Sequence, residues 1–154
     1  MRALITGGAK RLGREMSLYL AKRGYDVAVH YNSSDDDARA VVDEIHALGC
    51  RATQLQANIL DETQVETLVS RAATALGGPI TVLVNNASIF EYDNIKSATR
   101  RTWDRHIESN LRAPFVLTQK FADQIPDPSL DHNSEPVAAG LIVNMLDQRV
   151  KKLT

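Results

Sequence analysis

A glycine-containing segment, TGGAKRLG at residues 6–13, directly follows the first apolar run of the chain and precedes a helical pattern. Glycines between a strand and a helix allow a tight turn and a close approach of the backbone to a ligand. The free N–H groups at the start of the following helix attract an anion. Gly7 and Gly13 are therefore candidate contacts to the pyrophosphate of a dinucleotide, and the place of the segment between strand and helix carries this interpretation.

Arg11 lies inside this segment, at the expected start of the helix. A guanidinium at that place can pair with phosphate oxygens and can also project over a neighbouring substrate site. Its planar set of donors suits a heteroaromatic ring. The alternative is an ordinary solvated arginine at the start of a helix.

These residues need a scaffold, and short apolar runs alternate with amphipathic stretches along almost the whole chain. The apolar runs predict strands at 2–6, 25–31, 51–57, 80–87 and 140–145. The amphipathic stretches predict helices at 10–24, 33–49, 61–76 and 97–124, and residues 126–136 read as a polar loop. Gly24 and Gly49 end the first two helices, Ser33 and Ser34 can cap the second, and Pro114 predicts a break in the fourth.

The regular alternation of strands and helices predicts parallel βαβ units wound on both faces of one sheet. The expected fold class is α/β, a Rossmann-type doubly wound parallel sheet with about five strands. Sheets of this kind usually have six strands, so we expect the C-terminal strands and helices to be missing. We interpret residues 1–154 as one nucleotide-binding domain that is incomplete at its C-terminus.

The composition argues against several classes of partner. A net charge of −1 gives no electrostatic attraction to nucleic acid or to an anionic membrane. No apolar run reaches the roughly 18 residues of a membrane span, and the N-terminus enters a strand without a signal peptide. The single cysteine, Cys50, cannot form an internal disulfide, which favours a reducing cytoplasm. The four histidines lack ligand spacing, so no metal is assigned.

Three segments together resemble the short-chain dehydrogenase/reductase family over the entire chain: TGGAKRLG, NNAS at 85–88 and NLRAPF at 110–115. Two departures from the family patterns TGxxxGxG and NNAG are similar to its pteridine reductases. Arg11 replaces the middle glycine of the first pattern, and Ser88 replaces the glycine of the second. Phe90 matches the aromatic residue that stacks on the pterin ring in those enzymes. The resemblance implies an NADPH-dependent reductase of a dihydropterin-like or dihydrofolate-like pteridine, and a homo-oligomer, by family resemblance a tetramer.

Two other functions stay open. A general ketone or aldehyde reductase of the same family would pack Phe90 into its structure rather than stack it on a ring. A non-catalytic nucleotide-binding module would follow if the chain ends naturally at Thr154. That ending would leave the fifth strand without its neighbour and would expose apolar sheet.

The end of the second expected strand favours NADP(H) over NAD(H). NAD-specific enzymes place an acid there for the ribose 2′-hydroxyl, and a 2′-phosphate would be repelled by it. The sequence VHYNSS has no acid before Asp35, and Lys10 lies where many NADP-dependent family members carry a basic residue. The candidate donors to a phosphate at this strand end are His30, Asn32, Ser33 and Ser34. The aspartates at 35–37 would weaken a phosphate site, although acids in a first helical turn are also explained by the helix dipole.

The resemblance implies further cofactor contacts. Asn58, followed by Ile59, stands where the family commonly holds adenine with an aspartate, and an amide oxygen can still accept from the adenine amino group. Leu12 and Ala87 belong to the matched segments, so we also expect them to contact the cofactor. Asn86 matches an asparagine that lines the cofactor, with a strand-end cap as its alternative role.

Two candidate catalytic residues follow from the same resemblance. Asn110 matches an asparagine that orders a proton-relay water, with a helix kink before Pro114 as the alternative. Asp147 in VNMLD matches the aspartate that pteridine reductases carry in place of the catalytic serine of the family, where it orients a tyrosine and supplies protons. An exposed acid at a strand end is the alternative for Asp147.

The family follows this position with Tyr-x-x-x-Lys, in which the lysine lowers the pKa of the proton-donating tyrosine. No such pair follows Asp147. Tyr92 and Lys96 lie in a loop before the fourth helix, where we interpret their spacing as coincidence. We therefore expect these 154 residues to be the N-terminal part of a longer reductase and to be inactive alone.

Overall fold

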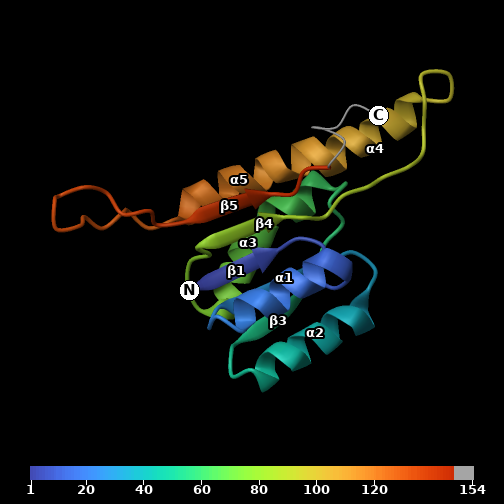
Figure 1. Cartoon of the computed structure of the whole chain (residues 1–154). Coiled ribbons are helices and arrows are strands. Elements are labelled where there is room, and N and C mark those ends of the chain that lie inside the picture. The colour runs from blue at the N-terminus through green and yellow to red at the C-terminus, as the bar shows by residue number, and fades with distance from the viewer. Residues whose placement is uncertain (148–154) are drawn as a thin grey trace.

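A five-stranded parallel sheet forms the centre of the computed structural model, which describes residues 1–147 (Figure 1). The strands are β1 Arg2–Ile5, β2 Asp26–Tyr31, β3 Ala52–Gln56, β4 Val82–Asn85 and β5 Leu141–Asn144. Their order across the sheet is β3-β2-β1-β4-β5, and every neighbouring pair is parallel. The order reverses between β1 and β4, which is the switch point where doubly wound sheets bind ligands. The expected Rossmann-type α/β fold is confirmed.

Helices cover both faces of the sheet. They are α1 Arg11–Ala21, α2 Asp35–Ala47, α3 Glu62–Leu76, α4 Arg100–Ile107 and α5 Ala113–Gln124, with a π-helical turn, η1, at Glu108–Arg112. Helices α1 and α2 lie on one face and α3 and α5 on the other (Figure 1). Apolar side chains of α1 and α2 pack with Ala3 and Ile5 of β1, whereas those of α3 and α5 pack with Leu4. Successive residues of a strand point to opposite faces, so the short apolar run of β1 serves both layers.

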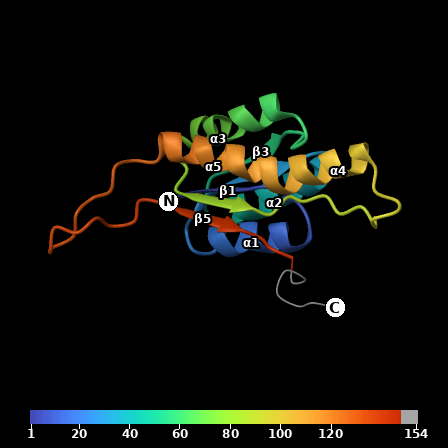
Figure 2. The same cartoon turned by 90° about the horizontal axis from the view of Figure 1, so that it is seen from above.

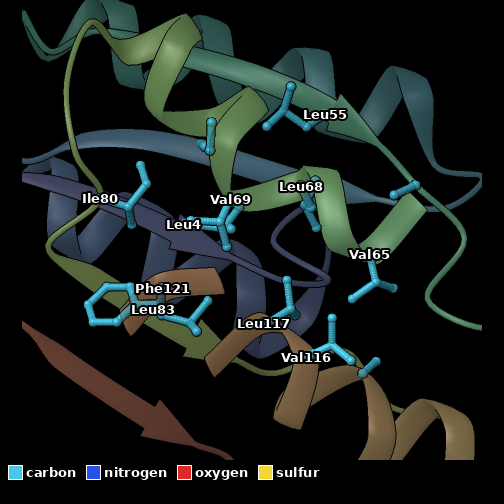
Figure 3. Packing of buried hydrophobic residues seen from close by; sticks show 14 of the residues in the cluster. Leu4, Leu55, Val65, Leu68, Val69, Ile80, Leu83, Val116, Leu117 and Phe121 are labelled. Carbon is cyan, nitrogen blue, oxygen red and sulfur yellow. The ribbon is translucent and has the colours of Figure 1, made fainter. Parts of the chain in front are cut away.

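The face beneath α3 and α5 holds the larger group of buried side chains (Figure 3). Leu68 of α3 and Leu117 of α5 meet Leu4 and Leu83 of the sheet there, and all four are almost fully buried. Strands with both faces covered read as continuous apolar runs. In contrast, Leu141 of β5, at the edge of the described sheet, is 56% exposed.

One expectation about a helix cap and one about a strand boundary need correction. Ser34 occupies the N-cap position of α2, but neither it nor Ser33 makes a side-chain capping bond there. Strand β4 ends at Asn85 rather than at residue 87, because the N–H groups of Asn86 and Ala87 turn to the Thr6 hydroxyl instead of a neighbouring strand.

The expected break at Pro114 lies one turn earlier. The helical region starts at Arg100, and the π turn Glu108–Arg112 precedes Pro114, which occupies the first turn of α5. Proline has no N–H, so the carbonyl of Asn110 cannot receive the usual bond from four residues ahead. The chain widens to a five-residue spacing instead, and the N–H of Ala113 donates to the carbonyl of Glu108.

The polar loop at 126–136 is present and projects away from the sheet between α5 and β5 (Figure 2). A single antiparallel bridge between Leu130 and Pro136 closes its tip. The loop lies at the end of the sheet opposite to the switch point (Figures 1 and 2).

Candidate functional site

Two cavities of about 600 and 750 Å³ lie at the carboxyl ends of the strands. The first, called here the loop cavity, lies beside the β1–α1 segment and the ends of β2 and β3. The second, the edge cavity, lies between η1, α5 and the end of β5. Arg11, Leu12 and the segment 86–89 border both cavities, so the two are neighbours along one wall.

The predicted site residues gather on these walls. All predicted cofactor contacts except Ser33 and Ser34 line the loop cavity: Gly7, Lys10, Arg11, Leu12, Gly13, His30, Asn32, Asn58, Ile59, Asn86, Ala87 and Ser88. The predicted substrate and catalytic residues line the edge cavity: Arg11, Ser88, Phe90, Asn110 and Asp147. The structure therefore brings both sets together, and their chemical roles stay predictions.

The glycines of the loop are required by close backbone contacts. A Cβ on Gly13 would stand 2.0 Å from the carbonyl oxygen of Gly7 and 2.7 Å from the amide nitrogen of Asn86. Gly7 has φ +63°, the left-handed region that favours glycine. Lys10, at the N-cap of α1, makes no side-chain capping bond, and the first N–H groups of a helix have no partners inside it. The helix start can therefore receive an anion.

Thr6 and Asn86 hold this loop against the end of β4. The hydroxyl of Thr6 donates to the carbonyl of Val84 at 3.2 Å and accepts from the N–H groups of Asn86 and Ala87 at 2.9 and 3.0 Å. The amide of Asn86 donates to the carbonyls of Thr6 and Gly7 at 2.9 and 3.2 Å. Thr6 was not predicted as a site residue, although it opens the segment TGGAKRLG and is a polar residue at the end of an apolar strand.

His30 lines the loop cavity, but its ring makes other bonds than the predicted ones. Its ring is 2% exposed; Nδ1 accepts from the N–H of Gly7 at 3.1 Å, and Nε2 lies 3.0 Å from the carbonyl of Ala57. An N–H can only donate and a carbonyl can only accept, so the neutral ring carries its proton on Nε2. Burial lowers the pKa of His30 to about 4. The expectation that His30 donates to a phosphate does not fit, because both ring nitrogens already bond the main chain.

The aspartates at the start of α2 have three different environments. Asp35 accepts from Tyr31, from Gln54 at 3.1 Å and from Arg39 at 3.0 Å. Asp37 forms an ion pair of 2.8 Å with Lys10. Asp36 is exposed. Lys10 therefore reaches the loop cavity with a carboxylate beside it, and Ser33 and Ser34 lie off the cavity wall.

Arg11 adopts φ +51°, in the left-handed region, at the position where glycine was expected by resemblance. Among the described residues no acid forms an ion pair with it. Its guanidinium is thus available to both cavities. Asn58, on the far side of the loop cavity, uses its side-chain oxygen to accept from the N–H of Leu60 at 3.1 Å, which leaves one further lone pair on that oxygen.

The wall of the edge cavity is more exposed. Phe90 is 71% exposed, and Asp147 is exposed beyond the end of β5. The amide of Asn110, within the π turn, accepts from the N–H of Ile89 at 3.0 Å and donates to its carbonyl at 2.9 Å. Asn110 therefore positions the segment that carries Ser88 and Phe90.

Arg105 is a cation of the loop cavity that the sequence did not indicate. It forms an ion pair of 2.9 Å with Glu91, whose N–H donates to Nε2 of His106 at 3.1 Å. These contacts tie the segment after β4 to α4. Tyr92 and Lys96, which have the Tyr-x-x-x-Lys spacing, line neither cavity, and Tyr92 is 87% exposed.

No group of three or more metal-ligating side chains is found within residues 1–147. No helix in that part of the chain has the length and apolar character needed to cross a membrane.

Comparison with known proteins agrees with this architecture. The chain is 37% identical over 123 residues to the 3-oxoacyl-(acyl-carrier-protein) reductase FabG of Staphylococcus epidermidis. The aligned residues cover 80% of this chain and 50% of that protein. The structure of FolM alternative dihydrofolate reductase 1 from Brucella canis, complexed with NADP, matches with a TM-score of 0.87 and 37% identity over 99% of this chain and 58% of that one.

A short chain dehydrogenase from Burkholderia cenocepacia, in complex with NADP, matches with a TM-score of 0.78 and 40% identity over 82% of this chain and 51% of that one. The chain spans between 50% and 58% of the length of these three proteins. Residues 1–145 match the sequence pattern of the short chain dehydrogenase family. With the glycine loop at the switch point of a parallel sheet, this match shows that the chain belongs to the short-chain dehydrogenase family.

Proposed function

We propose that the protein containing this chain is an NADPH-dependent reductase that transfers hydride to a pteridine, such as a dihydropterin or a dihydrofolate. The wall shared by the two cavities is the observation that carries the proposal. Arg11 and the segment 86–89 border both cavities, so a dinucleotide in the loop cavity and a ring in the edge cavity would meet there.

The loop cavity fits a dinucleotide phosphate. A Cβ at Gly13 would fill the cradle between the Gly7 carbonyl and Asn86, and the start of α1 has no side-chain cap. Lys10 and Arg11 add positive charge. The nicotinamide would supply the hydride, while these residues bind and orient its carrier. NADP in the similar Brucella and Burkholderia structures, and the lack of an acid between Val29 and Ser34, support NADP(H) over NAD(H).

The edge cavity offers groups that suit a flat heterocycle. Phe90 exposes an aromatic face for stacking, and Arg11 and Ser88 can donate hydrogen bonds at the edge of a ring. Asp147 has a carboxyl that can hold a proton at the cavity rim. The similarity to a protein named alternative dihydrofolate reductase supports this substrate class. A cytoplasmic location and a homo-oligomeric state, expected from the sequence, belong to the same proposal.

A second candidate function is the reduction of a carbonyl group on an acyl thioester. The 37% identity to a 3-oxoacyl reductase favours it. In that case Phe90 would contact the acyl chain and not a ring, and Arg11 would bind the cofactor alone.

The two functions are separated by purifying the whole protein that contains this chain and following its oxidation of NADPH with dihydrobiopterin, dihydrofolate and a 3-oxoacyl thioester. We expect turnover with the pteridines, and Asp147→Asn should lower its rate and change its pH dependence, because an amide cannot relay a proton. Turnover with the thioester alone would favour the second function. A protein that binds neither NADPH nor NADP⁺ would contradict both.

A further inference from the structure

Lys10 does not enter the loop cavity as a free cation. It stands at the uncapped start of α1, and its Nζ lies 2.8 Å from Oδ2 of Asp37 in the first turn of α2. The two side chains are 57% and 47% exposed, so water and a ligand can reach both. The pair joins the start of α1, where Lys10 lines the loop cavity, to the first turn of α2.

Asp37 is the one acid of its turn that touches a cavity cation. Asp35 is engaged by Tyr31, Gln54 and Arg39, and Asp36 is exposed with no bond to Lys10. The helix dipole would favour an acid at any of these three positions. The dipole therefore does not explain why Asp37 contacts Lys10.

We propose that Asp37 competes with the 2′-phosphate of NADP(H) for Lys10, and so lowers the affinity for the phosphorylated cofactor relative to the unphosphorylated one. This inference rests on the proposed cofactor. A phosphate that binds Lys10 displaces the Asp37 carboxylate or approaches it closely, and either event opposes binding. NAD(H) lacks that phosphate and leaves the ion pair intact. Asp37 thus sets how strongly the site prefers NADP(H).

The test compares Asp37→Asn with Asp36→Asn in the purified protein, using calorimetric titration with NADP⁺ and with NAD⁺. Both variants remove one negative charge from the same helical turn, but only the first removes a partner of Lys10. We expect Asp37→Asn to tighten NADP⁺ binding about three- to tenfold. Asp36→Asn should change it by less than about twofold, because exposed charges at a distance are screened. Neither variant should change NAD⁺ binding.

A second arm places Asp37→Asn in a Lys10→Gln background. If Asp37 acts through Lys10, its gain in NADP⁺ affinity should fall below about twofold there, because the competed cation is gone. An equal gain in both backgrounds would overturn the inference, as would equal gains from Asp36→Asn and Asp37→Asn, or no gain from Asp37→Asn. If the wild-type protein binds NADP⁺ but reduces no pteridine, the proposed substrate fails while this inference stands. If it binds no NADP⁺, both fail.

Discussion

The walls of the loop cavity and the edge cavity differ in how their polar groups are bonded. On the loop-cavity side, Thr6, His30 and Asn86 are buried or half-buried, and each joins two strand ends through hydrogen bonds. On the edge-cavity side, Phe90 and Asp147 are exposed beside a π turn and the edge strand β5. The strand-end groups on the loop-cavity side are fixed by bonds to neighbouring strands, whereas Phe90 and Asp147 lie exposed in connecting segments.

This difference has a consequence for function. Buried, bonded groups hold one geometry, because leaving a donor unpaired is costly. That arrangement suits the binding of a dinucleotide pyrophosphate in one fixed position. Connecting segments on a rigid scaffold tolerate change and commonly set specificity. We therefore expect substitutions on the loop-cavity wall to change both stability and cofactor binding, and those on the edge-cavity wall to change substrate binding alone.

The largest expected effect is that of Gly13→Ala on the loop-cavity wall. The new Cβ would stand 2.0 Å from a backbone oxygen, so the loop must shift. We expect NADP⁺ binding to weaken by about 3 kcal/mol, or about 100-fold, in calorimetric titration. Gly24→Ala is the control: its Cβ would meet no atom within 4 Å, so only the strain of φ +81° applies and cofactor binding should not change. Comparable binding losses in both variants would contradict the role of the loop contact.

A smaller loss is expected when the Thr6 hydroxyl is removed. In Thr6→Val the N–H groups of Asn86 and Ala87 lose their acceptor, which should lower the free energy of unfolding by about 2–3 kcal/mol in urea titration. Thr118→Val makes the same chemical change on the edge-cavity wall, where no hydrogen bond of that hydroxyl to a described residue is found, and should stay within about 0.5 kcal/mol. Equal losses would remove the distinction between the two walls.

The next effect comes from pH and concerns His30. Its pKa is about 4 in the folded protein, against 6.5 for an unperturbed histidine, so the unfolded chain binds more protons between these values. The stability from the neutral ring is therefore present above pH 6.5 and is lost as the pH falls towards 4.

Between pH 7.5 and 5 this loss should reach about 2 kcal/mol in the free energy of unfolding. His30→Asn should remove this part of the pH dependence, whereas His132→Asn, at an exposed position of the projecting loop, should retain it. Urea midpoints at the two pH values provide the measurement. An unchanged slope in His30→Asn would show that His30 is not the responsible group.

The smallest expected free-energy change lies on the edge-cavity wall. Phe90→Ala should weaken pteridine binding by about 1–2 kcal/mol through lost stacking, while NADP⁺ affinity and stability stay nearly constant. Tyr92→Ala is a matched control, because Tyr92 is exposed in the same segment but lines neither cavity. Fluorescence titration with a pterin in the presence of NADP⁺ measures the effect. Equal pterin affinity in Phe90→Ala and wild type would exclude stacking.

Local sequence patterns determined the order of the elements and the position of the glycine loop. Apolar runs such as RALI and LIVN, and the helical spacing between them, reflect burial of one or both faces, which a chain encodes residue by residue. The demand for glycine at positions 7 and 13 is likewise local, because it follows from a tight turn between β1 and α1. The gathering of Arg11, Phe90 and Asp147 on one cavity also follows from strand ends meeting at one edge of a parallel sheet.

Tertiary structure alone decided which groups are left for a ligand. His30 has a sequence position that suits a phosphate donor, yet its ring bonds Gly7 and Ala57, which lie 23 and 27 residues away. Lys10 forms an ion pair with Asp37 because separate crossovers return to the same edge of the sheet. For the same reason Arg105 reaches the loop cavity. Hydrogen bonds and ion pairs depend on atomic distances between remote segments, and residue type with local period carries no information about those distances.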